Sequence, residues 1–242
     1  MTVLFFGVLG SVSFLTVWMA YWIYRRLPDH WLCEYGEAPS EIHRPEHRCA
    51  NSKRTLLLLT AAVWMALLSV FIRRTGGILD SAYGQWTELS YMMLMSLILL
   101  PSVLSDLDYL IIPDQTCAAA AAAAVLKVGL MDGFSGVTDA AAGGLTCGVL
   151  AWISAAVPSF LTGSESMGMG DLKLLTACGA AAAASAEEGT GYMAGISVFS
   201  GAVLMSAVWF SLLLLLGKSC CGDARPMAPW IVFSALMSIA WF

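Results

Sequence analysis

The stretch from Met193 to Leu216, MAGISVFSGAVLMSAVWFSLLLLL, contains no charged residue over 24 positions. A helix of about 20 mostly apolar residues is long enough to cross the hydrocarbon core of a bilayer. The stretch therefore predicts a transmembrane helix. The whole chain has the same character, because 59% of its 242 residues are hydrophobic and only 12% are charged. A soluble domain carries about 25% charged residues, so we expect an integral membrane protein.

Seven further apolar runs predict an all-α, polytopic membrane helix bundle of about eight transmembrane spans. The runs lie at residues 3–24, 55–72, 89–104, 116–131, 140–160, 172–186 and 228–242. We expect three regions: a first span (1–24), a polar cytoplasmic loop (25–54) and a membrane domain (55–242). The runs 116–131 and 172–186 are rich in alanine. Since small side chains let membrane helices approach closely, we expect these two spans to lie inside the bundle.

The basic residues predict the orientation of the bundle. With the loop 25–54 in the cytoplasm, nine Lys and Arg residues lie on the cytoplasmic side, and three lie on the other side or within the membrane. Cytoplasmic loops are enriched in Lys and Arg, so this orientation is favoured. It places Asp106, which follows run 89–104, and Asp171, which precedes run 172–186, near the cytoplasmic face.

Asp106 and Asp171 are the candidates for chemistry. An ionisable side chain at membrane depth costs roughly 2.5–3.5 kcal/mol and usually marks a functional site. Taken alone, an acid at a span end can equally be a solvated residue or one that favours a helix dipole. The sequence Gly168-Met-Gly170-Asp171 favours function, because glycine lets the backbone approach another chain closely. An extended peptide substrate requires such access.

Two aspartates can share one proton when they lie close together, because like charges a few ångströms apart resist double ionisation. The ionised acid can then deprotonate a water molecule that attacks a peptide carbonyl. The protonated acid can donate to the carbonyl oxygen and later to the leaving amine. The pair therefore predicts aspartic proteolysis, which requires no metal ion.

Two stretches around these acids resemble the catalytic motifs of the bacterial type IV prepilin peptidases, which are GxGD-type intramembrane aspartic proteases. Residues 106–114 (DLDYLIIPD) resemble the first motif, and residues 165–175 (ESMGMGDLKLL) resemble the second. Ala228-Pro229-Trp230 resembles the start of the family's last span, so the likeness extends from about residue 88 to the C-terminus. It implies that Asp106 and Asp171 are catalytic, with support from Asp108, Pro113, Asp114, Glu165, Gly168, Gly170 and Lys173. Ser166 departs from the pattern, since the family usually has Gly there.

The resemblance implies an endopeptidase that removes the short basic leader from type IV prepilins or type II secretion pseudopilins. Such leaders end in Gly just before a hydrophobic helix, and the cut would be made at the cytoplasmic face of the bacterial inner membrane. Many members also methylate the new N-terminus with S-adenosylmethionine. The sequence shows no site for that cofactor, which we expect only if the second activity is retained. We expect these substrates and membrane lipids as partners, and no nucleic acid, because no basic patch with interleaved aromatics occurs.

The polar loop departs from the family in its cysteines. Many members carry two Cys-x-x-Cys pairs there, associated with zinc. This chain has only Cys33 and Cys49, with His30, His43 and His47 nearby. A tetrahedral zinc site needs four converging ligands, so we expect no zinc site and a peptidase activity without a metal.

Two other functions stay open at this point. A transporter could use Asp106 and Asp171 to bind cations or relay protons. Two acids near one face argue against it, because a transport site is expected nearer the midplane. A catalytically silent assembly factor of a pilus or secretion system is the third interpretation, and the intact acids weigh against it.

Other polar and aromatic residues have structural interpretations. Lys127, in run 116–131, is expected to extend toward an interface or to pair with Asp132 or Asp139. Aromatic residues at span ends are expected to anchor the chain at the membrane interfaces: Trp18, Tyr21, Tyr24, Trp86 and Tyr91. Cysteines within apolar runs are expected to act as small hydrophobic residues.

Overall fold

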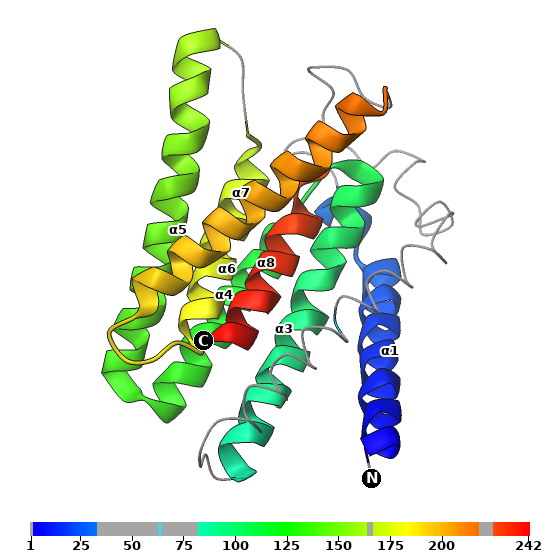
Figure 1. Ribbon diagram of the computed structural model, residues 1–242, viewed down its shortest axis with the longest axis vertical. Helices are drawn as coiled ribbons and strands as arrows, with labels where there is room; N and C mark the ends of the chain where they lie inside the picture. The colour runs from blue at the N-terminus through cyan, green and yellow to red at the C-terminus, as the bar shows by residue number, and fades with distance from the viewer. Residues whose placement is uncertain (1, 33–62, 64–81, 164–166, 218–224) are drawn as a thin grey trace.

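The computed structural model describes residues 2–32, 63, 82–163, 167–217 and 225–242 (Figure 1). This part of the chain contains helices and no strand, which confirms the all-α fold. The elements are α1 (Thr2–Arg26), the short 3-10 helix η1 (Asp29–Trp31), α3 (Ala82–Tyr109), α4 (Asp114–Met131), α5 (Gly133–Thr162), α6 (Met169–Ala183), α7 (Gly191–Leu215) and α8 (Ala228–Trp241).

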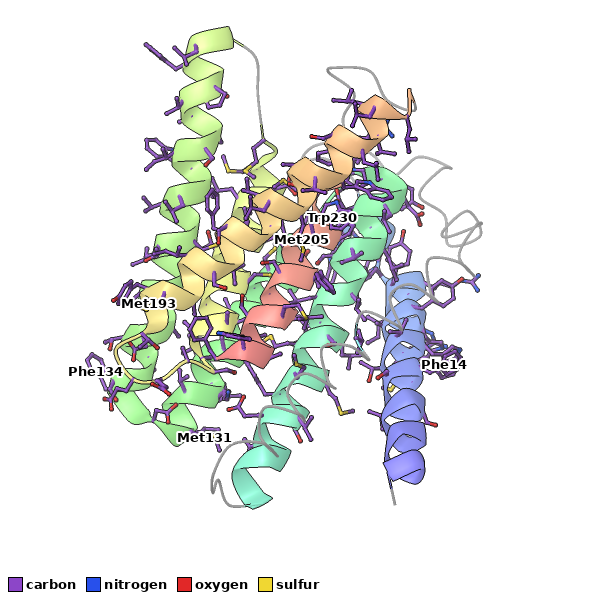
Figure 2. The ribbon with its side chains drawn as sticks, viewed as in Figure 1. Phe14, Met131, Phe134, Met193, Met205 and Trp230 are labelled. Atoms are coloured by element: carbon purple, nitrogen blue, oxygen red, sulfur yellow. The ribbon has the colours of Figure 1, made fainter. Side chains whose placement is uncertain are left out.

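Among the described residues, three helices are long and apolar enough to cross a membrane, and they lie at Thr87–Tyr109, Gly133–Leu161 and Gly191–Leu215. Large apolar side chains also cover the outside of the bundle. Figure 2 shows Phe14 projecting away from α1, and Trp152 on α5 and Val208 on α7 are equally well exposed. Soluble monomers rarely expose apolar surface on this scale, so the fold is that of a membrane helix bundle. The count of eight spans stays a prediction, because most of run 55–72 lies outside the described residues.

Helix α3 is longer than the apolar run 89–104 from which it was predicted. It continues through Ser105 and Asp106 to Tyr109, so Asp106 lies within the helix. Leu110 then adopts a left-handed backbone conformation, with φ 58°, and ends the helix. A leucine in this conformation costs roughly 1–2 kcal/mol, so packing around the turn must hold it there.

Helix α6 is the centre of the bundle and packs against α4, α5, α7 and α8. All but one of its residues from Leu174 to Ala183 are buried. Its alanines and glycines allow this, since the backbone of Gly143 on α5 lies so close that an added Cβ would be 2.4 Å from the Cβ of Ala183. The prediction of an interior Ala-rich helix is confirmed for α6. It is wrong in part for α4, which buries one face and exposes the other.

A buried ion pair joins three helices far from Asp106. Lys127 Nζ on α4 lies 2.7 Å from Glu88 Oε1 on α3 and 2.9 Å from Ser185 Oγ, just beyond α6. It also lies 4.2 Å from the ring centroid of Tyr91, whose hydroxyl donates to Ala181 O on α6. The predictions for Lys127 and Tyr91 were therefore wrong. Both side chains lie between helices. The Lys127 ammonium and the Tyr91 hydroxyl find polar partners there, so neither has to reach the membrane–water interface.

Lys127→Met should lower the free energy of unfolding by about 3 kcal/mol, since it leaves the largely buried carboxylate of Glu88 with the Ser185 hydroxyl but without a cation. The double variant Lys127→Met/Glu88→Leu should recover most of this loss. Thermal unfolding of the detergent-solubilised protein measures the effect. Lys173→Met is the matched control, because Lys173 belongs to a half-exposed ion pair worth at most about 1 kcal/mol. Equal losses in the two single variants would contradict the prediction.

Candidate active site

Asp106 lies in the last turns of α3 and is buried, with 4% of its surface exposed. Its Oδ2 accepts a hydrogen bond of 2.8 Å from the backbone N–H of Ala228, the first residue of α8. The end of α3 and the start of α8 therefore meet at the Asp106 side chain.

Asp171 lies in the first turn of α6, three residues after the N-cap residue Gly168. Its Oδ1 is buried, and no group among the described residues forms a hydrogen bond with it. Asp106 is close enough to act electrostatically on Asp171, so residues 65 positions apart in the sequence form a carboxylate pair at one end of the bundle.

The turn between α3 and α4 brings the two acids together. Ile112, in this turn, packs directly on Gly170, where an added Cβ would lie 3.2 Å from the Ile112 Cβ. Hydroxyl groups fix the turn from within: Ser105 Oγ donates to Ile111 O at 2.5 Å, and Thr116 Oγ1 donates to Pro113 O at 2.6 Å. The absence of a side chain at Gly170 therefore sets how near α6 comes to the end of α3.

The supporting acids lie around this pair. Asp108 is exposed, and its Oδ2 accepts a hydrogen bond of 2.8 Å from Tyr24 on α1. Asp114 begins α4 and pairs with Lys173 on α6, with Nζ 2.8 Å from both carboxylate oxygens. Pro113 is buried as the N-cap residue of α4. Glu165 lies outside the described residues.

Three contacts were not foreseen from the sequence. Tyr24 was expected at a membrane interface, but it is fully buried and ties α1 to Asp108. No sequence signal reveals that contact, because its partners are 84 positions apart. The sequence did contain a signal for the hydrogen bond of the Ala228 amide. Pro229 follows Ala228 and has no N–H, so it cannot act as a donor at the start of this helix and Ala228 can. The third contact is that of the Asp114 carboxylate with Lys173.

Metal-ligating groups do not gather at this site: among the described residues no set of three or more His, Cys, Asp or Glu side chains could hold a metal ion. Cys33, Cys49, His43 and His47 fall outside the described residues, so the expectation about zinc stays a prediction. Cys117, Cys147 and Cys178 are free thiols, and they are buried in the way expected of small hydrophobic residues.

A membrane helix bundle with a carboxylate pair at one end, of which Asp106 is buried and Asp171 partly buried, is thus the class of protein that the fold and the site define. Residues 91–222, more than half of the chain, match the model of the type IV leader peptidase family. The chain belongs to this family of peptidases. The matched range contains both acids of the pair and ends before α8. Comparisons with curated proteins and with solved structures found no match.

Proposed function

We propose that the chain is an aspartic endopeptidase that removes the leader peptide from type IV prepilins or type II secretion pseudopilins. Asp106 and Asp171 are its catalytic pair. The proposal is carried by the proximity of these two acids, in a chain of the leader peptidase family. Each acid comes from a different helix, and a backbone amide at the start of α8 holds Asp106.

The chemistry of the pair is acid–base catalysis. Two carboxyl groups that lie close enough to act on one another favour a state with one proton between them. A water molecule gives its proton to the ionised carboxylate as it attacks the scissile carbonyl carbon, and the protonated carboxyl group donates to the carbonyl oxygen. When the tetrahedral intermediate collapses, the C–N bond breaks and the leaving nitrogen takes up a proton. Both proton transfers lie within the pair, so we propose that this step needs no cofactor.

The position of the pair suits a substrate cut next to a membrane helix. The acids lie at one end of the long apolar helix α3, not at its middle. In a substrate whose leader ends just before a hydrophobic helix, the scissile bond lies at the end of that helix, while the helix itself stays in the lipid. A transport site would be expected nearer the midplane, so this position favours the peptidase over a transporter.

Cleavage of prepilin and pseudopilin substrates by the purified protein tests the proposal. The full chain, in detergent or in proteoliposomes, is incubated with a candidate substrate, and mass spectrometry determines the new N-terminus. A single cut after the last leader residue is expected. A substrate left intact across all candidate classes, with a properly folded protein, would contradict it.

The cytoplasmic placement of the site has a topological test. Arg25 and Arg26, at the end of α1, are close in sequence to Tyr24, which contacts Asp108, so basic residues and the acid pair lie at the same end of the bundle. Basic ends favour the cytoplasm. Reporters fused after Arg54 or Gly163 should read cytoplasmic, and one near Gly77 should read external. An external signal after Gly163 would place Asp171 on the wrong side for a cytoplasmic cut.

A further inference from the structure

The two acids have unequal surroundings. Asp106 accepts a hydrogen bond of 2.8 Å from the Ala228 N–H. The buried Oδ1 of Asp171 has no hydrogen-bond partner among the described residues. Amide donors stabilise an ionised carboxylate, whereas a buried oxygen without a donor is costly when it carries charge. The proton shared by the pair should therefore reside mainly on one of the two carboxyl groups.

The start of α8 is built so that the Ala228 amide needs a buried acceptor. The N-cap residue is Met227, whose side chain makes no capping bond. Pro229 has no N–H, and the next two amides, those of Trp230 and Ile231, both point to Met227 O. The Asp106 carboxylate is the cap that the local sequence does not supply, and a negative charge there is favoured by the helix dipole.

The start of α8 is also held in place. Trp230, labelled in Figure 2, packs against Trp209 on α7, and the two ring centroids are 5.6 Å apart. Ala228 itself is fully buried. A donor fixed in this way orients one carboxylate oxygen without any reorganisation during the reaction.

We infer that Asp106 is the ionised member of the pair and the general base, held in this role by the Ala228 backbone N–H as a positioning group. Asp171 is the member that carries the proton. The inference rests on the proposed function. In the first step a proton passes from water to Asp106, the water oxygen bonds to the carbonyl carbon, and the Asp171 proton passes to the carbonyl oxygen. On collapse, Asp106 returns its proton to the leaving nitrogen, and the intermediate's hydroxyl returns one to Asp171.

Replacing Ala228 by lactic acid through nonsense suppression tests the inference, because it changes one amide into an ester and leaves the side chain intact. Removing a donor to the ionised form makes Asp106 easier to protonate. The acidic limb of the pH–kcat profile should then move to higher pH by about one unit, since a hydrogen bond to a charged group is among the strong ones. KM and the basic limb, which reports the proton on Asp171, should change little.

The matched control is lactic acid at Ala235, a buried alanine in the middle of α8. This ester removes an amide of the same helix far from Asp106, so it should leave the pH profile as in the wild type. The described ionisable groups on the segments that lead to this end of the bundle are the same in both esters: Tyr24, Arg25, Arg26, Asp108, Tyr109, Asp114, Lys173 and Arg225.

An unmoved acidic limb in the Ala228 ester, or an equal shift in the Ala235 ester, would overturn the inference. The outcome is separable from the fate of the proposed function. Loss of cleavage in Asp106→Asn, together with an unmoved limb in the ester, would retain the catalytic pair and reject only the assignment of its roles. Cleavage that survives in Asp106→Asn would remove the basis of both.

Discussion

Asp106→Asn and Asp171→Asn should each abolish leader removal while the protein still inserts and folds. Positioned acid–base catalysis contributes on the order of 10²–10⁴-fold, and each substitution removes one partner from both proton transfers. An asparagine at position 106 keeps an oxygen that accepts the Ala228 N–H, so the contact between α3 and α8 survives. The measurement is the rate of substrate cleavage, read from the new N-terminus by mass spectrometry, at equal amounts of folded protein.

Asp108→Asn is the matched control for this experiment. It is the same substitution on the same helix, but Asp108 is exposed and bonded to Tyr24. A two-acid mechanism gives it no role in proton transfer, so its loss should reduce cleavage only by a few fold, within the range of a surface hydrogen bond. If either Asp106→Asn or Asp171→Asn cleaves as fast as Asp108→Asn, that residue does not belong to the catalytic pair.

Gly170→Val should reduce cleavage by about 100-fold with little change in the amount of folded protein. The valine Cβ would lie 3.2 Å from the Ile112 Cβ, tighter than an ordinary contact, and its methyl groups need further room. The start of α6, and with it Asp171, must then move away from the turn after α3. A displacement of about 1 Å in a reacting group can cost about 100-fold in rate.

Two further variants separate this effect from a general loss of stability. Gly168→Ala places its Cβ no closer than 3.6 Å to the nearest atom, Asp171 Oδ2, so it should cause a much smaller loss. In an Ile112→Gly background the clash is gone, and Gly170→Val should cost less than it does in the wild type. Equal costs in the two backgrounds, read from the double-mutant cycle, would show that Ile112 is not the obstacle.

Long apolar runs determined most of the fold, because their length and lack of charge are local properties of the chain. The bounds of α4, α7 and α8 lie within about two residues of the runs that predicted them. Helices α5 and α3 departed from their runs, since α5 begins at Gly133, seven residues before the run 140–160, and α3 continues to Tyr109 although its apolar run ends at Leu104. An apolar run ends at the first polar residue, but a helix can continue through a buried aspartate whose carboxylate accepts a hydrogen bond. Asp106 accepts one from the backbone at the start of α8.

The candidate site was predicted in its residues, and its geometry depended on the tertiary structure. Asp106 and Asp171 stood out from the sequence because acids at membrane depth are costly and glycines precede the second one. Nothing local revealed that Ile112 packs on Gly170, that Tyr24 bonds to Asp108, or that Lys127 pairs with Glu88 across 39 positions. These contacts join distant helices, and a polar group in a bundle takes whichever partner the packing brings within reach. The sequence alone therefore determined which groups had to be satisfied, and only the tertiary structure decided by which partners.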